Sequence, residues 1–201
     1  MKKQIVVIHG GDTFDTYNEY LSFLKDFELD WEQLKIKKWK DNLGGQLGPD
    51  FEIITPLMPN KLNAKYLEWE IWFSKLIPFL DAEIVLVGHS LGGIFLVKYL
   101  SENILPLKIR GVFLVAAPYD DKNADYSLAD FNLSKDLKNL QLQTDALFIF
   151  HSQDDPVVPF ADLEKYKLAL PRANVVTFAD RGHFNQAEFP ELVHEIKKIF
   201  K

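Results

Sequence analysis

The sequence predicts an α/β fold with a mostly parallel sheet and helices on both faces, arranged in three layers. Short apolar segments alternate with longer helical patterns, and most of these segments are continuously apolar, as in strands buried on both faces. We expect about six strands in a single domain over residues 1–201, a length that allows one substantial core. The expected strands are Gln4–His9, Phe51–Ile54, Ile84–Val87, Gly111–Ala116, Ala146–His151 and Asn174–Phe178.

Four helices are expected where apolar residues recur at three- and four-residue spacing. In the first helix, Trp69, Trp72 and Phe73 share a stripe with Leu76 and Leu80, and we expect this stripe to pack against the sheet. The last helix begins with proline and glutamate, which suit a first turn. The expected helices are Tyr66–Leu80, Leu91–Leu100, Phe160–Leu170 and Pro190–Phe200.

Two stretches depart from this alternation. Leu29–Asp50 is expected to hold an extra helix and a glycine-rich turn, Gly44-Gly45 with Gly48-Pro49, before the second strand. The basic run Lys35–Lys40 within it is interpreted as the solvated face of a helix. Pro118–Lys135 follows the fourth strand and is irregular. Each stretch either lines or covers a site or is a plain surface loop.

Composition excludes several classes of function. The formal net charge of −6 argues against a nucleic-acid partner, because phosphate binding needs concentrated lysine and arginine. The absence of cysteine excludes disulfides, thiolate metal sites and a cysteine nucleophile. The first apolar run stops at His9, too early for a signal peptide, and no segment has the roughly 18 apolar residues of a membrane span. We therefore expect a cytoplasmic protein without a membrane partner, either a monomer or a homodimer.

Polar residues follow the expected strands where chemistry would be placed. Ser90 follows the third strand within Gly88-His89-Ser90-Leu91-Gly92, the pair Asp154-Asp155 follows the fifth, and His183 follows the sixth. Because ligands bind outside the carboxyl ends of parallel strands, these side chains are expected to share one site.

The residue types fit nucleophilic catalysis. A serine hydroxyl needs a base to attack, histidine has a suitable pKa, and a carboxylate behind the imidazole fixes its tautomer. The N–H group of Leu91, at a helix start, is a natural donor to an oxyanion. A second donor is expected from the loop after the first strand, where Gly11 allows close backbone approach.

Other aspartates and histidines are further candidates for these roles. Asp154 is a candidate for capping the turn, and Asp120 or Asp121 after the fourth strand is a rarer position for the acid. No metal site or cofactor is expected, because the remaining histidines lack H-x-H or H-E-x-x-H spacing and no phosphate-binding glycine motif occurs. Two of them are expected to be structural, next to the serine turn, and one to be exposed on a helix; the four are His9, His89, His151 and His194.

Four motifs together carry a family resemblance: H-G-G after the first strand, G-H-S-L-G-G, S-Q-D-D-P-V-V-P and G-H-F. The chain resembles the α/β-hydrolases in a minimal form, and its size is similar to the compact serine hydrolases related to retinoblastoma-binding protein 9. The resemblance implies Ser90 as nucleophile, Asp155 as acid and His183 as base. It also implies that the first two of the fold's usual eight strands are missing.

The resulting hypothesis is a cofactor-independent serine hydrolase that cleaves a carboxyl ester or thioester through an acyl-enzyme. Peptide or amide hydrolysis, or acyl transfer, on the same residues is an alternative, and a non-catalytic protein-binding role is another. The expected partner is a small-molecule acyl substrate. Its pocket is predicted to be built by Leu29–Asp50, Pro118–Lys135 and Phe160.

Overall fold

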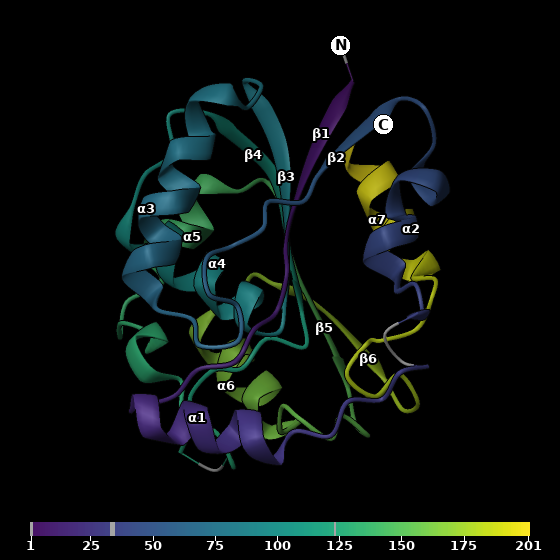
Figure 1. The fold of residues 1–201 in the computed structure, drawn as a ribbon. Coiled ribbons are helices and arrows are strands. Elements are labelled where there is room, and N and C mark those ends of the chain that lie inside the picture. Colours follow the sequence, from purple (N-terminus) through teal and green to yellow (C-terminus); the bar gives the residue numbers. More distant parts are fainter. Residues whose placement is uncertain (1, 33–34, 123) are drawn as a thin grey trace.

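The computed structural model describes residues 2–32, 35–122 and 124–201. Within these residues, six strands form one sheet whose neighbouring strands pair in parallel, in the order β2-β1-β3-β4-β5-β6 (Figure 1). The strands are β1 (Lys3–Ile8), β2 (Phe51–Ile54), β3 (Glu83–His89), β4 (Lys108–Val115), β5 (Leu147–Ser152) and β6 (Asn174–Phe178).

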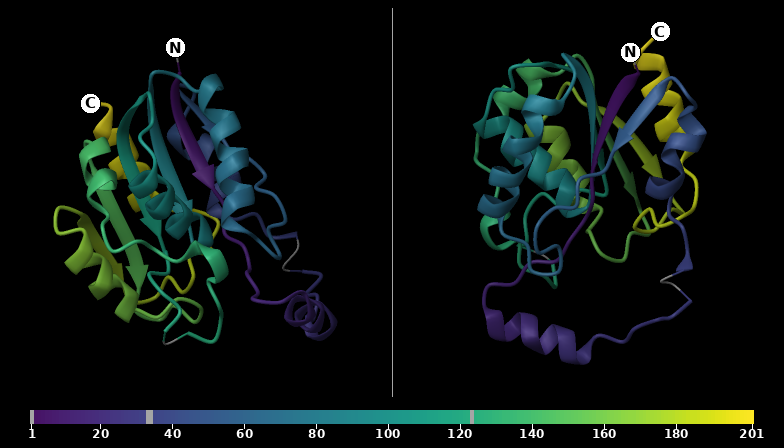
Figure 2. Two further views of the ribbon diagram at one scale, coloured as in Figure 1. Left: turned by 90° about the vertical axis from the view of Figure 1, so that its left-hand side faces the viewer. Right: turned by 45° about the horizontal axis from the view of Figure 1, so that its top comes forward.

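Helices cover both faces of this sheet, so the predicted three-layer α/β class is confirmed (Figure 2). One face is covered by α3 (Tyr66–Leu76), α4 (Leu91–Glu102), α5 (Lys138–Gln143) and α6 (Ala161–Ala169), and the other by α2 (Trp39–Leu47) and α7 (Pro190–Ile199). A further helix, α1 (Tyr17–Asp26), lies beyond the carboxyl ends of the strands, at the bottom of Figure 1.

The continuous apolar strands follow from this double coverage. Successive side chains of a strand point to opposite faces, so a strand covered on both sides must be apolar throughout. In β1, Val6 and Ile8 belong to the core beneath α3 and α4, whereas Ile5 and Val7 belong to the core beneath α2 and α7. The sheet is therefore the shared wall of two cores.

The strand order reverses between β1 and β3, which are neighbours in the sheet. The chain moves from β1 outward to β2, then returns past β1 to β3 and continues outward in the other direction. Such a reversal leaves a crevice at the carboxyl ends of the two strands, which is where open α/β sheets bind ligands. Ser90 follows β3 at this position, and Gly10 and Gly11 follow β1.

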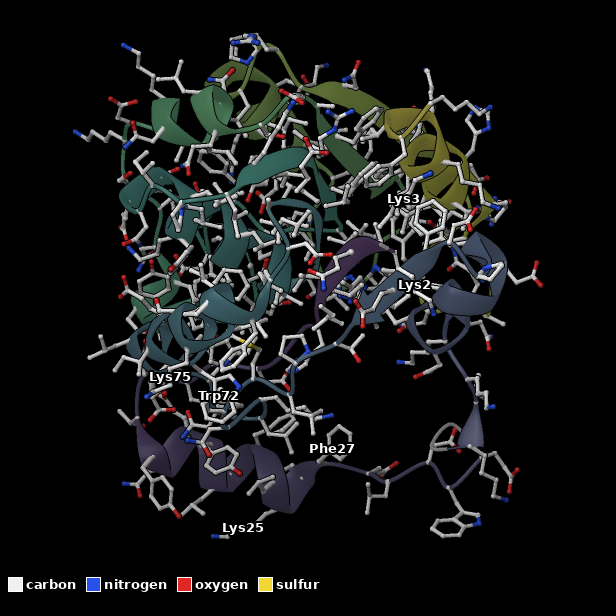
Figure 3. The ribbon with its side chains drawn as sticks, turned by 90° about the horizontal axis from the view of Figure 1, so that it is seen from above. Lys2, Lys3, Lys25, Phe27, Trp72 and Lys75 are labelled. Carbon is white, nitrogen blue, oxygen red and sulfur yellow. The ribbon has the colours of Figure 1, made fainter. Side chains whose placement is uncertain are left out.

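The helix expected over Tyr66–Leu80 is shorter than predicted. The α-helix ends at Leu76, and a 3₁₀ turn follows over Ile77–Phe79, because Pro78 lacks the N–H that would continue the helix. The predicted apolar stripe is also partly wrong. Trp69 and Phe73 are fully buried, but Trp72 is 49% exposed and extends from α3 away from the sheet (Figure 3).

The stretch before the second strand does contain the predicted extra helix, although Gln33 and Leu34 lie outside the described residues. The expected turn at Gly44-Gly45 is wrong, because both glycines lie within α2. The turn comes at Gly48, whose φ of 98° suits glycine. In the second irregular stretch, Asn123 also lies outside the described residues.

The basic run Lys35–Lys40 is not the solvated helix face that we predicted. Residues 35–38 precede α2, and the helix begins at the fully buried Trp39. The side chain of Lys40 turns inward to His89, at the end of β3. Two helices, α1 and α5, were not expected from the sequence at all.

None of the helices within the described ranges is long and apolar enough to cross a membrane.

The contrast between neighbouring aromatic residues on α3 is testable. Phe73→Ala removes a fully buried ring and is expected to lower the free energy of unfolding by about 3–5 kcal/mol. Trp72→Ala is expected to change it by less than about 1 kcal/mol, because the ring is half exposed. Urea denaturation followed by circular dichroism measures both, and equal losses would contradict the orientation of α3.

Candidate active site

Ser90 occupies a sharp turn between β3 and α4. Its backbone has φ 55° and ψ −123°, in a region that a residue with a side chain adopts only under strain. The Ser90 N–H donates to the Val115 carbonyl at 2.8 Å, and the Ser90 carbonyl accepts from the Gly93 N–H at 2.8 Å. These hydrogen bonds to β4 and to the first turn of α4 hold the serine at the carboxyl end of β3.

The glycines on either side of Ser90 are required for space. A Cβ atom on Gly92 would lie 2.5 Å from the His9 carbonyl oxygen, and one on Gly88 would lie 2.7 Å from the Gly93 Cα. Both contacts are with backbone, which cannot swing aside. The ends of β1 and β3 and the start of α4 can therefore come this close only because positions 88 and 92 are glycine.

His183, after β6, lies against Asp155, after β5. The imidazole Nδ1 is 2.9 Å from Asp155 Oδ2 and 3.0 Å from Oδ1. The carboxylate is fully buried, and its Oδ1 also accepts the N–H groups of Val157 at 2.8 Å and Val158 at 3.0 Å. With Nδ1 donating to the carboxylate, the other ring nitrogen of His183 is left to accept a proton.

Asp154 has a different role from its neighbour. Its Oδ1 accepts the Ser152 hydroxyl at 2.5 Å and the Gly182 N–H at 2.8 Å, and these hydrogen bonds, the first above all, lower the pKa of the carboxyl. Asp154 thus ties the His183 loop to the end of β5 without touching the imidazole. It caps the turn, as one of the readings of the sequence proposed.

The rarer acid candidates after β4 are engaged elsewhere. Asp120 pairs with Lys165 at 2.7 Å, and Asp121 accepts the Leu128 N–H at 2.9 Å. Among the described contacts, neither carboxylate reaches a histidine.

His89, which precedes Ser90 in the chain, contacts His183. Its ring centroid is 4.9 Å from that of His183, and its Nε2 is 2.9 Å from the His183 carbonyl oxygen. No hydrogen bond joins the Ser90 hydroxyl to the His183 ring among the described residues.

A cavity of about 650 Å³ opens at Ser90, and it is lined by both residues predicted to supply oxyanion donors, Leu91 and Gly11. Leu91 is the first residue of α4, so its N–H has no partner within the helix. A Cβ on Gly11 would lie 2.5 Å from the Lys61 carbonyl and 3.3 Å from the Leu91 side chain. Gly11 is therefore packed against the Lys61 backbone and the Leu91 side chain, where a larger residue would not fit.

The cavity walls come partly from segments that were not expected to contribute. Phe14 and Phe23 line it from the loop after β1 and from α1, and Val157 and Val158 line it from the turn after Asp155. The irregular stretch after β4 contributes as predicted, with Tyr126 and its neighbours, whereas Phe160 and the described residues of Leu29–Asp50 are not part of the lining.

A readable signal for α1 existed in the sequence. Thr16 and Glu19 form a capping box, in which each side chain accepts the backbone N–H of the other residue. A threonine followed three residues later by glutamate is a known helix start.

The remaining histidines occupy distinct positions. His9 accepts the Met58 N–H at Nε2, so its Nδ1, 2.6 Å from the Gly10 carbonyl, carries the proton; burial lowers its pKa. His151 is fully buried behind the Asp155 turn, with Nε2 3.1 Å from the Val158 carbonyl. His194 is exposed on α7. Within the described ranges, no three His, Asp or Glu side chains cluster to hold a metal.

A parallel sheet with this strand order, a strained serine turn after β3, and a histidine bound to a buried carboxylate after later strands define the α/β-hydrolase class. Residues 31–197 match the serine hydrolase family. The chain belongs to that family and is a serine hydrolase, so the predicted resemblance is confirmed.

Individual relatives agree with this assignment. Serine hydrolase RBBP9 of Rattus norvegicus is 26% identical over 159 residues, which are 75% of this chain and 79% of the rat protein. The solved structure of the ydeN gene product from B. subtilis superposes with a TM-score of 0.71 at 19% identity, covering 99% of both chains. A meta-cleavage product hydrolase from Pseudomonas fluorescens gives 0.65 at 13% identity, covering 98% of this chain and 90% of the other. At such identities the two structures support the fold alone.

Proposed function

We propose that this serine hydrolase cleaves a small carboxyl ester or thioester through an acyl-enzyme, with Ser90 as nucleophile, His183 as base and Asp155 as the acid. The observations that carry the proposal are the pairing of the His183 imidazole with the buried Asp155 carboxylate and the strained turn that holds Ser90 at an open cavity. This combination is typical of nucleophilic catalysis.

In the acylation step, the Ser90 oxygen attacks the acyl carbon and His183 Nε2 takes the hydroxyl proton. The tetrahedral oxyanion is stabilised by the N–H groups of Leu91 and Gly11, and Asp155 stabilises the imidazolium. The bond to the alcohol or thiol then breaks, and the imidazolium gives its proton to the leaving group. In deacylation, His183 takes a proton from water, which attacks the acyl carbon. The bond to Ser90 then breaks to release the acid, and the imidazolium gives its proton to the Ser90 oxygen.

The cavity favours an apolar acyl group of modest size. Phe14, Phe23, Leu91 and Val158 supply apolar surface, and the volume of about 650 Å³ is in the range of small-molecule sites. Five carboxylates also line the cavity, and its described lining contains no lysine, arginine or histidine; the five are Asp12, Asp15, Glu19, Asp121 and Asp125. The field in the cavity is therefore negative and opposes anionic substrates.

Ser90→Ala tests the nucleophile. It is expected to lower kcat for 4-nitrophenyl butyrate by about 10³-fold or more and to abolish labelling by a fluorophosphonate, because the attacking oxygen is gone. Ser134→Ala, at an exposed serine outside the cavity, is the matched control and should retain both activities. Wild-type protein that hydrolyses a peptide amide but no ester would contradict the ester assignment.

Two adjacent substitutions test the acid. Asp155→Asn is expected to reduce kcat by about 10³–10⁴-fold, since the amide cannot fix the imidazole in the reactive tautomer. Asp154→Asn keeps the side-chain oxygen that accepts from Ser152 and Gly182, so its effect should stay below about tenfold. Steady-state kinetics on the same ester measure both, and the reverse order would show that the acid is Asp154.

The charge of the cavity predicts substrate preference. The mono-4-nitrophenyl ester of succinic acid, which is anionic, is expected to have a kcat/KM about tenfold or more below that of 4-nitrophenyl butyrate. The difference should shrink at high ionic strength, because salt screens the carboxylates. Equal kcat/KM values at low salt would show that these side chains do not face the substrate.

A further inference from the structure

Lys40 is an unusual lysine, since it is largely buried beneath the serine turn. Its Nζ is 3.0 Å from His89 Nδ1, and it forms no ion pair with a carboxylate among the described residues. Its pKa is lowered to about 8, chiefly by burial; Lys38 and Lys61 act in the same direction, and Asp41 opposes them. Because a buried ammonium without a counterion is unfavourable, its position calls for a role other than stability.

The contacts with Lys40 and with the His183 carbonyl place the His89 proton on the same ring nitrogen. An ammonium group can only donate, so His89 Nδ1 must accept. A neutral imidazole then has its proton on Nε2, which is 2.9 Å from the His183 carbonyl oxygen and donates to it. Burial and then the charge of Lys40 lower the pKa of His89 well below its usual value, which keeps the ring neutral.

The carbonyl that His89 binds belongs to the tightest part of the His183 loop. Gly182 and Phe184, on either side, both have left-handed backbone, with φ of 50° and 52°. The Trp39 indole donates to the Phe184 carbonyl at 2.9 Å, and Asp154 holds Gly182 from the opposite side. Three hydrogen bonds thus set the orientation of the His183 peptide. Those from Trp39 and to Asp154 involve its neighbours Phe184 and Gly182, and only the one from His89 involves His183 itself.

We propose that Lys40 is a positioning residue for His183: by donating to His89 Nδ1, it keeps the His89 proton on Nε2, where it fixes the His183 carbonyl and hence the imidazole relative to Ser90. The effect on rate rests on the proposed function, because it requires His183 to be the base. The effect on the His89 tautomer does not.

The first experiment observes the tautomer directly. Nitrogen-15 NMR of histidine side chains in the unmodified protein is expected to show His89 as a neutral ring protonated on Nε2. Lys40→Met, which keeps the length of the side chain but not the donor, should give a mixture of the two neutral tautomers. A His89 ring protonated on Nδ1 in the unmodified protein overturns the proposal, whatever the variants do and whether or not any ester is hydrolysed.

The second experiment measures the kinetic consequence. Lys40→Met is expected to lower kcat for 4-nitrophenyl butyrate about tenfold with KM within about twofold, as for a small misplacement of a catalytic group. Lys40→Arg retains a donor and should recover at least half of kcat. The control is Lys37→Met, an exposed lysine of the same segment, which should match the unmodified protein.

A merely structural role gives a different pattern. Losing the hydrogen bond and relieving the buried charge act in opposite directions on stability, so the Tm of Lys40→Met should stay within a few degrees of the original. A fall in kcat accompanied by a proportionate fall in Tm, with His89 still protonated on Nε2, overturns the proposal. So does a Lys40→Met variant with unchanged kcat.

A double substitution tests the route through His89. In His89→Gln the side-chain amide can donate to the His183 carbonyl without help from Lys40, so adding Lys40→Met should cause no further loss of kcat. An undiminished tenfold loss in this background would show that Lys40 acts by another route and overturns the proposal. If Lys40→Met does not fold, the tautomer in the unmodified protein and the kcat of Lys40→Arg still decide.

Discussion

The close approach of three backbone segments at Ser90 is the constraint on which the rest of the molecule depends. The start of α4 lies so near the end of β1 that a Cβ on Gly92 would lie 2.5 Å from the His9 carbonyl oxygen, and a Cβ on Gly93 would lie 2.5 Å from the Ala117 Cβ, after β4. The helix is therefore wedged between the ends of two strands. This placement requires β1 and β3 to be neighbours, which is the point where the strand order reverses.

The packing of α4 between these strand ends also offsets the strain of the Ser90 backbone. Such a backbone conformation costs about 1–3 kcal/mol for a non-glycine residue, and it persists only where the surrounding structure fixes it. Ten of the twelve residues of α4 are buried, and the Ser90 N–H is bonded to β4, so moving the serine to a relaxed conformation would displace a whole buried helix. The strain is local, whereas the packing that holds it extends over one face of the sheet.

The sequence carried these features because they are local in the chain. Apolar continuity located the strands, and glycines two positions from Ser90 identified the turn. Contacts between segments far apart in the chain are harder to predict from the sequence. Lys40 reaches His89 across 49 positions, and in the sequence it belonged to a basic run whose other members are solvated or precede the helix. The three-residue spacing from Trp69 predicts that Trp72 is in the core, but on α3 it lies outside the buried stripe and is half exposed.

The cavity walls are held by polar contacts, whereas the serine turn is held by buried packing. The residues that set substrate specificity therefore differ from those that position the reacting serine. The loop after β1 and the stretch after β4 are joined by polar bonds near the surface, from the Thr13 hydroxyl to the Ser127 carbonyl and from the Ser127 hydroxyl to Asp15 at 2.7 Å. The adjoining helix α1 has no buried residue. Such walls can change in sequence without disturbing the wedge at Gly92, because neither core includes α1. The type of reaction therefore depends on buried glycines and on residues at the strand ends, which the fold constrains tightly. The substrate is selected by surface segments that the fold constrains far less.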